Sequence, residues 1–231
     1  MLNLWENLHT NFLTKGVIKI DNYIYLSEKD KKITSVGFSK KEIKNHKGIS
    51  GLKYYLIILY LRKHVQTFGQ IALTLNDLLQ EIGYSTKTNN KSIYSDFREI
   101  IKTELINKGY ASCNTDIFVV KPNDLFYLQL SYERNVFFTE DSFVQITISE
   151  YEKICSLSSK INKSILLGIY LYIKQYIMDY SGDITPAKIS FPSKTQIAKG
   201  LDTSIPRMMN NYGYHKERKE KVITRSISRK I

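Results

Sequence analysis

The sequence predicts a helix-rich α+β protein in which one supersecondary unit occurs twice. Two apolar segments of helical length, 51–65 and 162–180, are each followed by a short strand-like stretch and a capped amphipathic helix that ends at a turn. The spacing is constant, since Thr74 and Ser193 lie 119 positions apart and so do Ser85 and Ser204. Duplication of one unit explains this recurrence, and chance matching of two amphipathic helices is the alternative.

The first 65 residues predict a hairpin and then a helix. Short apolar pieces alternate over 12–38, as GVIKIDNYIYL and KKITSVGF joined by the charged SEKDKK, and this pattern is typical of a β-hairpin. The segment 51–65 is apolar enough for a buried helix, with Lys53, Arg62 and Lys63 expected at its wet ends.

The next part of the chain predicts two helices joined by a corner. Thr74 is a candidate N-cap, Gly83 a candidate stop, and the positions between them that share one helical face are Leu75, Leu78, Leu79 and Ile82. A second helix is expected from Ser92 to about Lys108, ending at Gly109, with the inward stripe Ile93, Phe97, Ile100, Ile101 and Leu105. The stretch YASCNTDIFVV then predicts two short strands around the turn 114–116. Helix, short strand, helix, corner, helix, hairpin is the order of a winged helix.

The pattern returns after strand-like stretches in 124–148. Residues 162–180 predict a second buried helix, KISF a short strand, and SKTQIAKGLDTSIPRMMNNY two helices around a corner. The side chains expected to fill the crossing of these two helices are Ile197, Leu201, Ile205 and Met208, with Ala198 small because the helices approach closely. Ser204 can satisfy the free amides of the following helix, and Pro206 fits its first turn.

Four regions follow from this pattern. Residues 1–50 form an N-terminal hairpin and lead-in, and 51–123 a first winged-helix domain. Residues 124–148 are connecting strands, and 149–231 a second winged-helix domain with a basic C-terminal tail. The second domain lacks a clear wing, because the residues after Tyr214 supply one strand at most.

Charge points to a polyanionic partner. The 231-residue chain carries a net charge of +12 and a pI of about 9.4, which favours nucleic acid first and an anionic membrane surface second. From Ser204 to Ile231 there are eight Lys or Arg and two Glu, so half of the net charge lies in the last 28 residues. Such a run can follow a phosphate backbone, or it can be a solvated end.

The helix after the second corner carries the candidate base-reading residues. Arg suits guanine and Asn suits adenine, so the predicted readers are Ser204, Arg207, Asn210 and Asn211. The predicted phosphate contacts are Lys194, Thr195, Gln196, His215, Lys216, Arg218 and Lys219. The corresponding set in the first unit is Lys87, Lys91, Ser92, Tyr94, Ser95, Arg98 and Lys102. Asp96 and Glu99 dilute the positive charge there, so this helix can instead face a partner subunit.

Nothing in the sequence predicts an enzyme, a cofactor or a metal. The four histidines stand far apart, and neither a phosphate-binding glycine loop nor a nucleophile elbow occurs. Cys113 and Cys155 share no paired spacing and are expected to be buried or idle thiols. The chain has no signal-peptide pattern and no apolar run of bilayer length, so we expect a cytoplasmic protein that acts away from membranes.

The segment TQIAKGLDTS (195–204) resembles the helix-turn-helix segment of bacterial regulators. Two such units in a basic chain of this length are similar in layout to plasmid and phage replication initiators with tandem winged-helix domains. The resemblance covers roughly 50–215 as architecture and about 20 residues as motif. The chain departs from the pattern at Gly200, which weakens the first helix, and at Asp202, which stands where Gly is usual but tolerates left-handed angles.

The resemblance implies a function and partners. It implies a sequence-specific protein that binds repeats of double-stranded DNA at the origin of a plasmid, phage or other mobile element. It further implies dimerisation through the first winged-helix domain and contacts with host replication proteins. A winged-helix transcriptional regulator uses the same binding chemistry and remains the alternative. A non-enzymatic structural or protein-interaction module is the alternative from another class.

Overall fold

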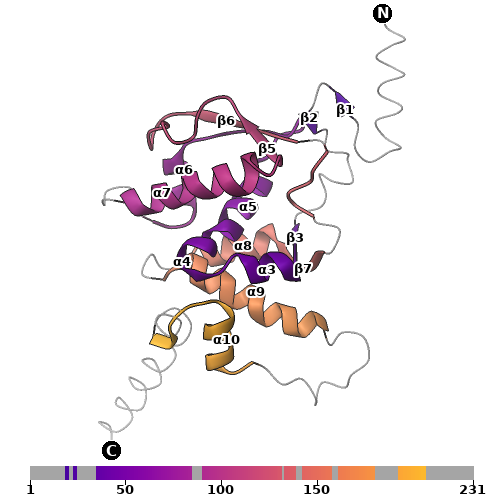
Figure 1. Ribbon diagram of the computed structural model, residues 1–231, viewed down its shortest axis with the longest axis vertical. Helices are drawn as coiled ribbons and strands as arrows, with labels where there is room; N and C mark the ends of the chain where they lie inside the picture. Colours follow the sequence, from indigo (N-terminus) through magenta and orange to yellow (C-terminus); the bar gives the residue numbers. More distant parts are fainter. Residues whose placement is uncertain are drawn as a thin grey trace, which may run out of the picture.

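The structure, a computed structural model, describes residues 19–20, 23–24, 35–84, 90–131, 133–138, 142–157, 161–179 and 192–206. Within them the chain is a helix-rich α+β protein with small antiparallel sheets, which confirms the predicted class. Figure 1 shows one sheet with two helices at one end of the molecule and the last described helices at the other.

Most of the predicted helices are present at the expected positions. The elements up to residue 131 are β1 (Lys19–Ile20), β2 (Tyr23–Ile24), β3 (Ser35–Ser39), α3 (Lys40–Asn45), α4 (Gly48–Gly51), α5 (Lys53–His64), β4 (Gln70–Leu73), α6 (Leu75–Glu81), α7 (Lys91–Ile100), the π-helical η1 (Ile101–Ile106), β5 (Ala111–Cys113) and β6 (Phe126–Leu130). The elements after it are β7 (Ser142–Thr147), α8 (Ile148–Cys155), α9 (Lys163–Asp179) and α10 (Lys194–Gly200). We call 35–131 the N-terminal half and 142–206 the C-terminal half.

The predicted N-terminal hairpin is wrong in its pairing. β1 pairs with β2 inside the first apolar piece, whereas β3 pairs antiparallel with β7, more than 100 residues away in the chain. Val36 and Phe38 of β3 are buried, and so are Val144 and Ile146 of β7. Because each strand has one apolar face to bury, a partner with the matching alternation outcompetes the neighbouring segment.

The register of β3 and β7 has an approximate two-fold symmetry. Gly37 pairs with Gln145 at the centre, and each of these residues lies two positions before the residue that caps the following helix, Ser39 or Thr147. On either side, Val36 pairs with Ile146 and Phe38 with Val144. Exchanging the two strands therefore leaves the pairing unchanged, apart from a register shift after Phe38.

The elements after the two strands recur in the same way. Ser39 and Glu42 form a capping box that starts α3, and Thr147 and Glu150 form one that starts α8. Glu42 accepts a hydrogen bond of 3.1 Å from the Tyr54 hydroxyl of α5, and Glu150 accepts one from the Tyr170 hydroxyl of α9. The helices also contact each other across the halves, α3 with α9 and α8 with α5.

A three-stranded sheet of order β4–β6–β5 completes the N-terminal half. The predicted second strand at 117–120 is wrong. This segment forms a turn, although the side chains of Ile117 and Val120 are buried, and the strand that pairs with β5 is β6. The segment 124–148, expected to connect two domains, instead supplies β6 to this sheet and β7 to the pairing with β3. Strand-like stretches far apart in the chain thus find their partners through buried apolar faces.

The core is built on α5, which is buried from Lys53 to Arg62. α9 packs against it so closely that a Cβ on Gly168 would lie 2.7 Å from the Leu52 Cδ2 atom. The expectation that Lys53 and Arg62 lie in water is wrong, since they are 4% and 8% exposed. The Arg62 guanidinium lies 5.2 Å from the centre of the Phe137 ring, a cation–π contact that accommodates the buried charge.

Replacing Phe38 by Ala should lower the free energy of unfolding by about 3–5 kcal/mol. Its ring is 1% exposed and packs edge-on against Tyr55 at 5.1 Å between ring centres, so truncation leaves a cavity where the two halves meet. Phe118→Ala is the matched control, because that ring is 51% exposed. Urea unfolding monitored by circular dichroism measures both changes, and equal losses would contradict the burial argument.

Candidate nucleic-acid interface

The capped helix α10 starts where the sequence predicts. The Ser193 hydroxyl accepts a hydrogen bond of 3.2 Å from the Gln196 backbone N–H, and the Ser193 N–H donates to the Gln196 side chain at 2.7 Å. These two bonds form a capping box, which satisfies amides that the first turn of a helix leaves unpaired. The predicted N-cap is confirmed.

A tight corner follows α10. Asp202 adopts a left-handed backbone with φ of 50°, the conformation that the sequence leads us to expect of an Asp at this position. The Thr203 N–H donates to the Ala198 carbonyl at 3.0 Å, and helical backbone resumes at Ile205 and Pro206. Helical backbone therefore resumes after the four residues that follow α10.

The buried and exposed sides of this corner differ sharply in chemistry. Ile197, Ala198 and Leu201 are at most 5% exposed, as expected for residues that brace the corner. The expectation that Ile205 fills the crossing is wrong, because its side chain is 41% exposed. The predicted contact residues of this second unit that lie within the described chain are all exposed: Lys194, Thr195, Gln196 and Ser204.

Several predicted contact residues lie outside the described residues. They are Lys87 in the first corner and Arg207, Asn210, Asn211, His215, Lys216, Arg218 and Lys219 after Pro206. The structure places Lys194, Thr195, Gln196 and Ser204 at the surface, and the assignment of the further residues stays a prediction.

Gly200 has a packing role that the sequence did not indicate. A Cβ at this position would lie 2.1 Å from Cε2 of Tyr172, so the tyrosine ring of α9 occupies the space that any side chain would need. The glycine that weakens α10 as an isolated helix is therefore required for its contact with α9.

The N-terminal half contains a comparable cap and corner. Thr74 and Asp77 form the capping box of α6, Leu75, Leu78, Leu79 and Ile82 are fully buried, and Gly83 has a left-handed φ of 81°. The capping residue, the buried stripe and the stop are all as predicted. α7 then begins at Lys91, and Gly109 with φ of 73° follows the end of η1.

Two of the residues predicted as DNA contacts on α7 make hydrogen bonds within the protein instead. Tyr94 is 8% exposed and its hydroxyl donates to the Asn76 side chain, so its assignment as a contact residue is wrong. It lies on the face of α7 that carries Phe97, one turn away, and this face packs inward. The Arg98 guanidinium donates to the Val120 carbonyl at 2.7 and 3.2 Å, which fixes the segment between β5 and β6.

The remaining predicted residues of this helix stay near solvent. Lys91, Ser92 and Ser95 are exposed and Lys102 is half-buried. Asp96 does not simply dilute the surface charge, because it forms an ion pair with the buried Lys53 and accepts a hydrogen bond of 3.0 Å from the Ser50 hydroxyl. The pair attaches α7 to α5, and the sequence offered no signal for it beyond an acid on a basic helix.

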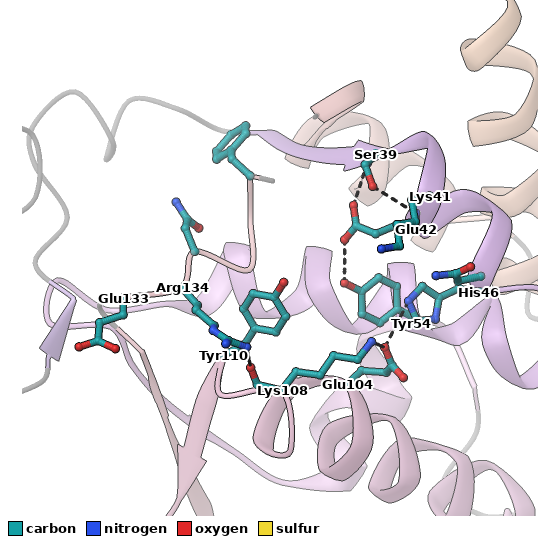
Figure 2. Close-up of a pocket in the computed structure, with 13 residues that line it drawn as sticks. Ser39, Lys41, Glu42, His46, Tyr54, Glu104, Lys108, Tyr110, Glu133 and Arg134 are labelled. Carbon is teal, nitrogen blue, oxygen red and sulfur yellow. Dashed lines mark hydrogen bonds and ion pairs between the residues drawn. The ribbon is translucent and has the colours of Figure 1, made fainter. Parts of the chain in front are cut away.

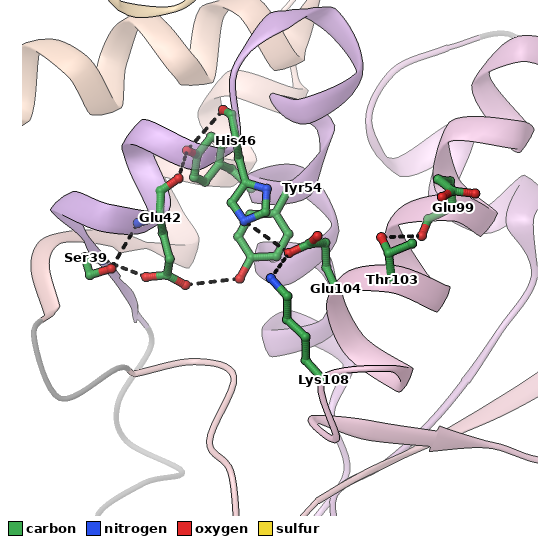
Figure 3. Close-up of polar contacts among 9 residues, drawn as sticks. Ser39, Glu42, His46, Tyr54, Glu99, Thr103, Glu104 and Lys108 are labelled. Atoms are coloured by element: carbon green, nitrogen blue, oxygen red, sulfur yellow. Dashed lines mark hydrogen bonds and ion pairs between the residues drawn. The ribbon is translucent and has the colours of Figure 1, made fainter.

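A polar pocket of about 500 Å³ lies between α3, η1 and residues 133–138 (Figure 2). At its floor, the His46 ring stacks on the Tyr54 ring with 3.8 Å between centres, and its Nε2 lies 3.3 Å from a Glu104 carboxylate oxygen (Figure 3). Lys108 pairs with the same carboxylate. Three cations and the three acids Glu42, Glu104 and Glu133 line this pocket, so its charges largely compensate one another.

A second and smaller hollow lies on the other side of α3, and reasoning from the sequence missed it. It is lined by Lys40, Lys44 and Lys47 together with residues of α9 and α10. The spacing i, i+4, i+7 in KKEIKNHK is the signal that could have revealed this lysine face.

Comparison of the chain with protein-family models, with curated proteins and with solved structures finds no match.

In the part of the chain that the structure describes, no group of three or more His, Cys, Asp or Glu is placed to hold a metal ion. Nor does any helix of that part combine the length and the apolar character that crossing a bilayer requires.

Removing the Asp96 carboxylate should destabilise the fold, because it leaves the buried Lys53 ammonium without its ion-pair partner. We expect Asp96→Ala to cost about 1–3 kcal/mol, because the Lys53 side chain is 5% exposed. In a Lys53→Met background the same substitution should cost clearly less, since no buried charge is left behind. A double-mutant cycle by urea unfolding measures the coupling, and additive costs would refute the buried pair.

His46 should make stability depend on pH. Burial holds the pKa of His46 below its ordinary value of 6.5, although the Glu104 carboxylate opposes this shift. The unfolded chain therefore binds a proton at higher pH than the folded chain does, and stability is full above pH 6.5 and falls as the pH drops towards the lowered pKa.

The test of this pH dependence compares two histidine variants. His46→Gln should flatten the loss of unfolding free energy between about pH 7 and about pH 5. His64→Gln is the control, because that side chain is 38% exposed. A slope that stays the same in His46→Gln and in the unmodified protein would show that another group carries the effect.

Proposed function

We propose that this protein binds double-stranded DNA sequence-specifically through tandem winged-helix units and acts as a replication initiator of a plasmid, phage or other mobile element. The observation that carries the proposal is the corner after α10. A capped helix, a left-handed residue and a return to helical backbone at Ile205 and Pro206 follow each other, braced by buried Ile197 and Leu201. This order supports a helix-turn-helix, a motif whose second helix enters the major groove.

The N-terminal half supports the winged-helix part of the proposal. Its elements run α5, β4, α6, α7, β5, β6, and its sheet has the order β4–β6–β5. A winged helix has this succession, with the segment between its last two strands as the wing. Residues 114–125 take that place between β5 and β6, and Arg98 of α7 fixes them through the Val120 carbonyl.

Charge and exposure support DNA as the ligand. The net charge of +12 favours a polyanion, and the exposed start of α10 offers Lys194, Thr195 and Gln196 to it. In the proposed complex these residues hold phosphates and Ser204, Arg207, Asn210 and Asn211 face the bases. The tail residues His215, Lys216, Arg218 and Lys219 extend the phosphate contacts along the backbone.

The role as an initiator rests on the resemblance in layout. A transcriptional regulator would use the same corner on the same kind of duplex. The location of the bound DNA sequence in the replicon therefore distinguishes the two functions. Fragments selected from the cognate replicon should map to iterated repeats at an origin for an initiator, and to a promoter operator for a regulator.

A protein-facing role for the first unit has its own support. Phe118, Val119 and Leu125 of the segment between β5 and β6 are 51%, 69% and 56% exposed, and large apolar side chains exposed within one short segment favour a protein contact. We propose that a second copy of the chain docks there, which would make the protein a dimer through its first unit. Val119→Asp should abolish such an association in analytical ultracentrifugation.

Binding to a selected duplex should weaken steeply with salt, and the predicted readers and phosphate contacts should respond differently. Arg207→Ala and Asn210→Ala should each cost about 1–3 kcal/mol on the preferred site and little on random DNA. Lys194→Gln should weaken binding to both and reduce the slope of log K against log salt by about 0.9. Fluorescence anisotropy over a salt series measures all three. Affinity that is blind to salt would favour the protein-interaction module.

A further inference from the structure

A lysine groove of about 320 Å³ lies where α3, α9 and α10 meet. Its walls are Lys40, Lys44 and Lys47 from α3 and the turn after it, Tyr172 and Gln175 from α9, and Gly200 from α10. The three lysines are exposed, and Ile43 between them is buried. In Figure 1, α9 runs between α3 on one side and α10 on the other.

The chemistry of the lysine groove suits an anion with several oxygens. The ammonium groups of Lys44 and Lys47 and the carboxamide of Gln175 can donate hydrogen bonds into it, and no carboxylate of the described residues lines it. The pocket at His46, on the other side of the same helix, is lined by three acids besides its cations. One face of α3 is therefore cationic, whereas acids compensate the positive charges on its opposite face.

The lysine groove is held in a fixed position relative to the corner after α10. The Gly48 N–H, one residue after Lys47, donates to the Leu201 carbonyl at 2.9 Å. The Tyr172 ring fills the space over Gly200, so the wall shared with α10 is closely packed. Whatever contacts the exposed start of α10 therefore meets the lysine face at a set distance.

We propose that the lysine groove binds the phosphate backbone of the duplex next to the segment that the corner of α10 contacts. The inference rests on the proposed function and assigns α3 to the same DNA-binding surface. Lys40 and Lys44 are one helical turn apart, about 6 Å along the axis. That spacing covers about two phosphate steps of one strand, each about 3.4 Å along the duplex.

The experiment removes lysines from opposite sides of α3 in the full chain. The test variant is Lys44→Gln/Lys47→Gln. The matched control is Lys41→Gln/Lys153→Gln, which removes the same charge, with Lys41 on the side of the His46 pocket and Lys153 exposed on α8. Anisotropy titrations against one selected duplex over a salt series give log K against log salt for each protein, and circular dichroism verifies folding.

We expect the slope to fall by about 1–2 in the test variant, about 0.9 for each phosphate that a lysine no longer neutralises, and by less than about 0.5 in the control. Shortening the duplex to the core site should then remove the difference between the two variants. Equal slopes in both variants, with steep salt dependence in the unmodified protein, would overturn the lysine groove and leave the proposed function intact. A different result would assign the groove to an acidic protein instead: the unmodified protein and the control bind polyglutamate, the test variant does not, and the slope of log K against log salt for DNA is the same in all three. Absence of DNA binding by the unmodified protein would overturn the proposed function itself.

Discussion

The pairing of β3 with β7 is the constraint on which the rest of this structure depends. Phe38 and Val36 on one strand and Val144 and Ile146 on the other bury their side chains together, and each strand leads directly into a capped helix. Joining the strands therefore sets the positions of α3 and α8, and these helices contact the long helix of the opposite half. The proposed DNA-binding corner and the lysine groove both take their places from this frame.

The basic residues of the chain do two different kinds of work. Lys53, Arg62 and Lys163 are buried. Lys53 forms an ion pair with Asp96, Arg62 packs against the Phe137 ring, and Lys163 donates a hydrogen bond to the Leu157 carbonyl. The lysines of α3 and the start of α10 remain at the surface. A net charge of +12 thus overstates the charge that a polyanion would meet, and the location of each cation matters more than the sum.

Local signals predicted the local structure well. Thr74 and Ser193 were recognisable as caps, and Gly83 and Asp202 as left-handed stops, because these residues act on their own backbone within a few positions. The partner of β3 was not predictable, since several strand-like stretches share the same alternation. Neither was the inward turn of Tyr94, whose hydroxyl could serve Asn76 or a ligand equally well until α6 and α7 were brought together. Of the candidate site, the start of α10 was found from the sequence, whereas the lysine groove exists only where α3, α9 and α10 pack together.

The central position of Gly37 and Gln145 has a consequence for how the two halves can diverge. These two residues face each other across the approximate axis, so each one is the other's environment. Close contact between the halves recurs at Gly168 and Leu52, which stand at the same offset in sequence as Tyr170 and Tyr54. A larger side chain at such a contact would displace both halves at once, so the two halves can diverge independently only at positions that lie away from their shared contacts.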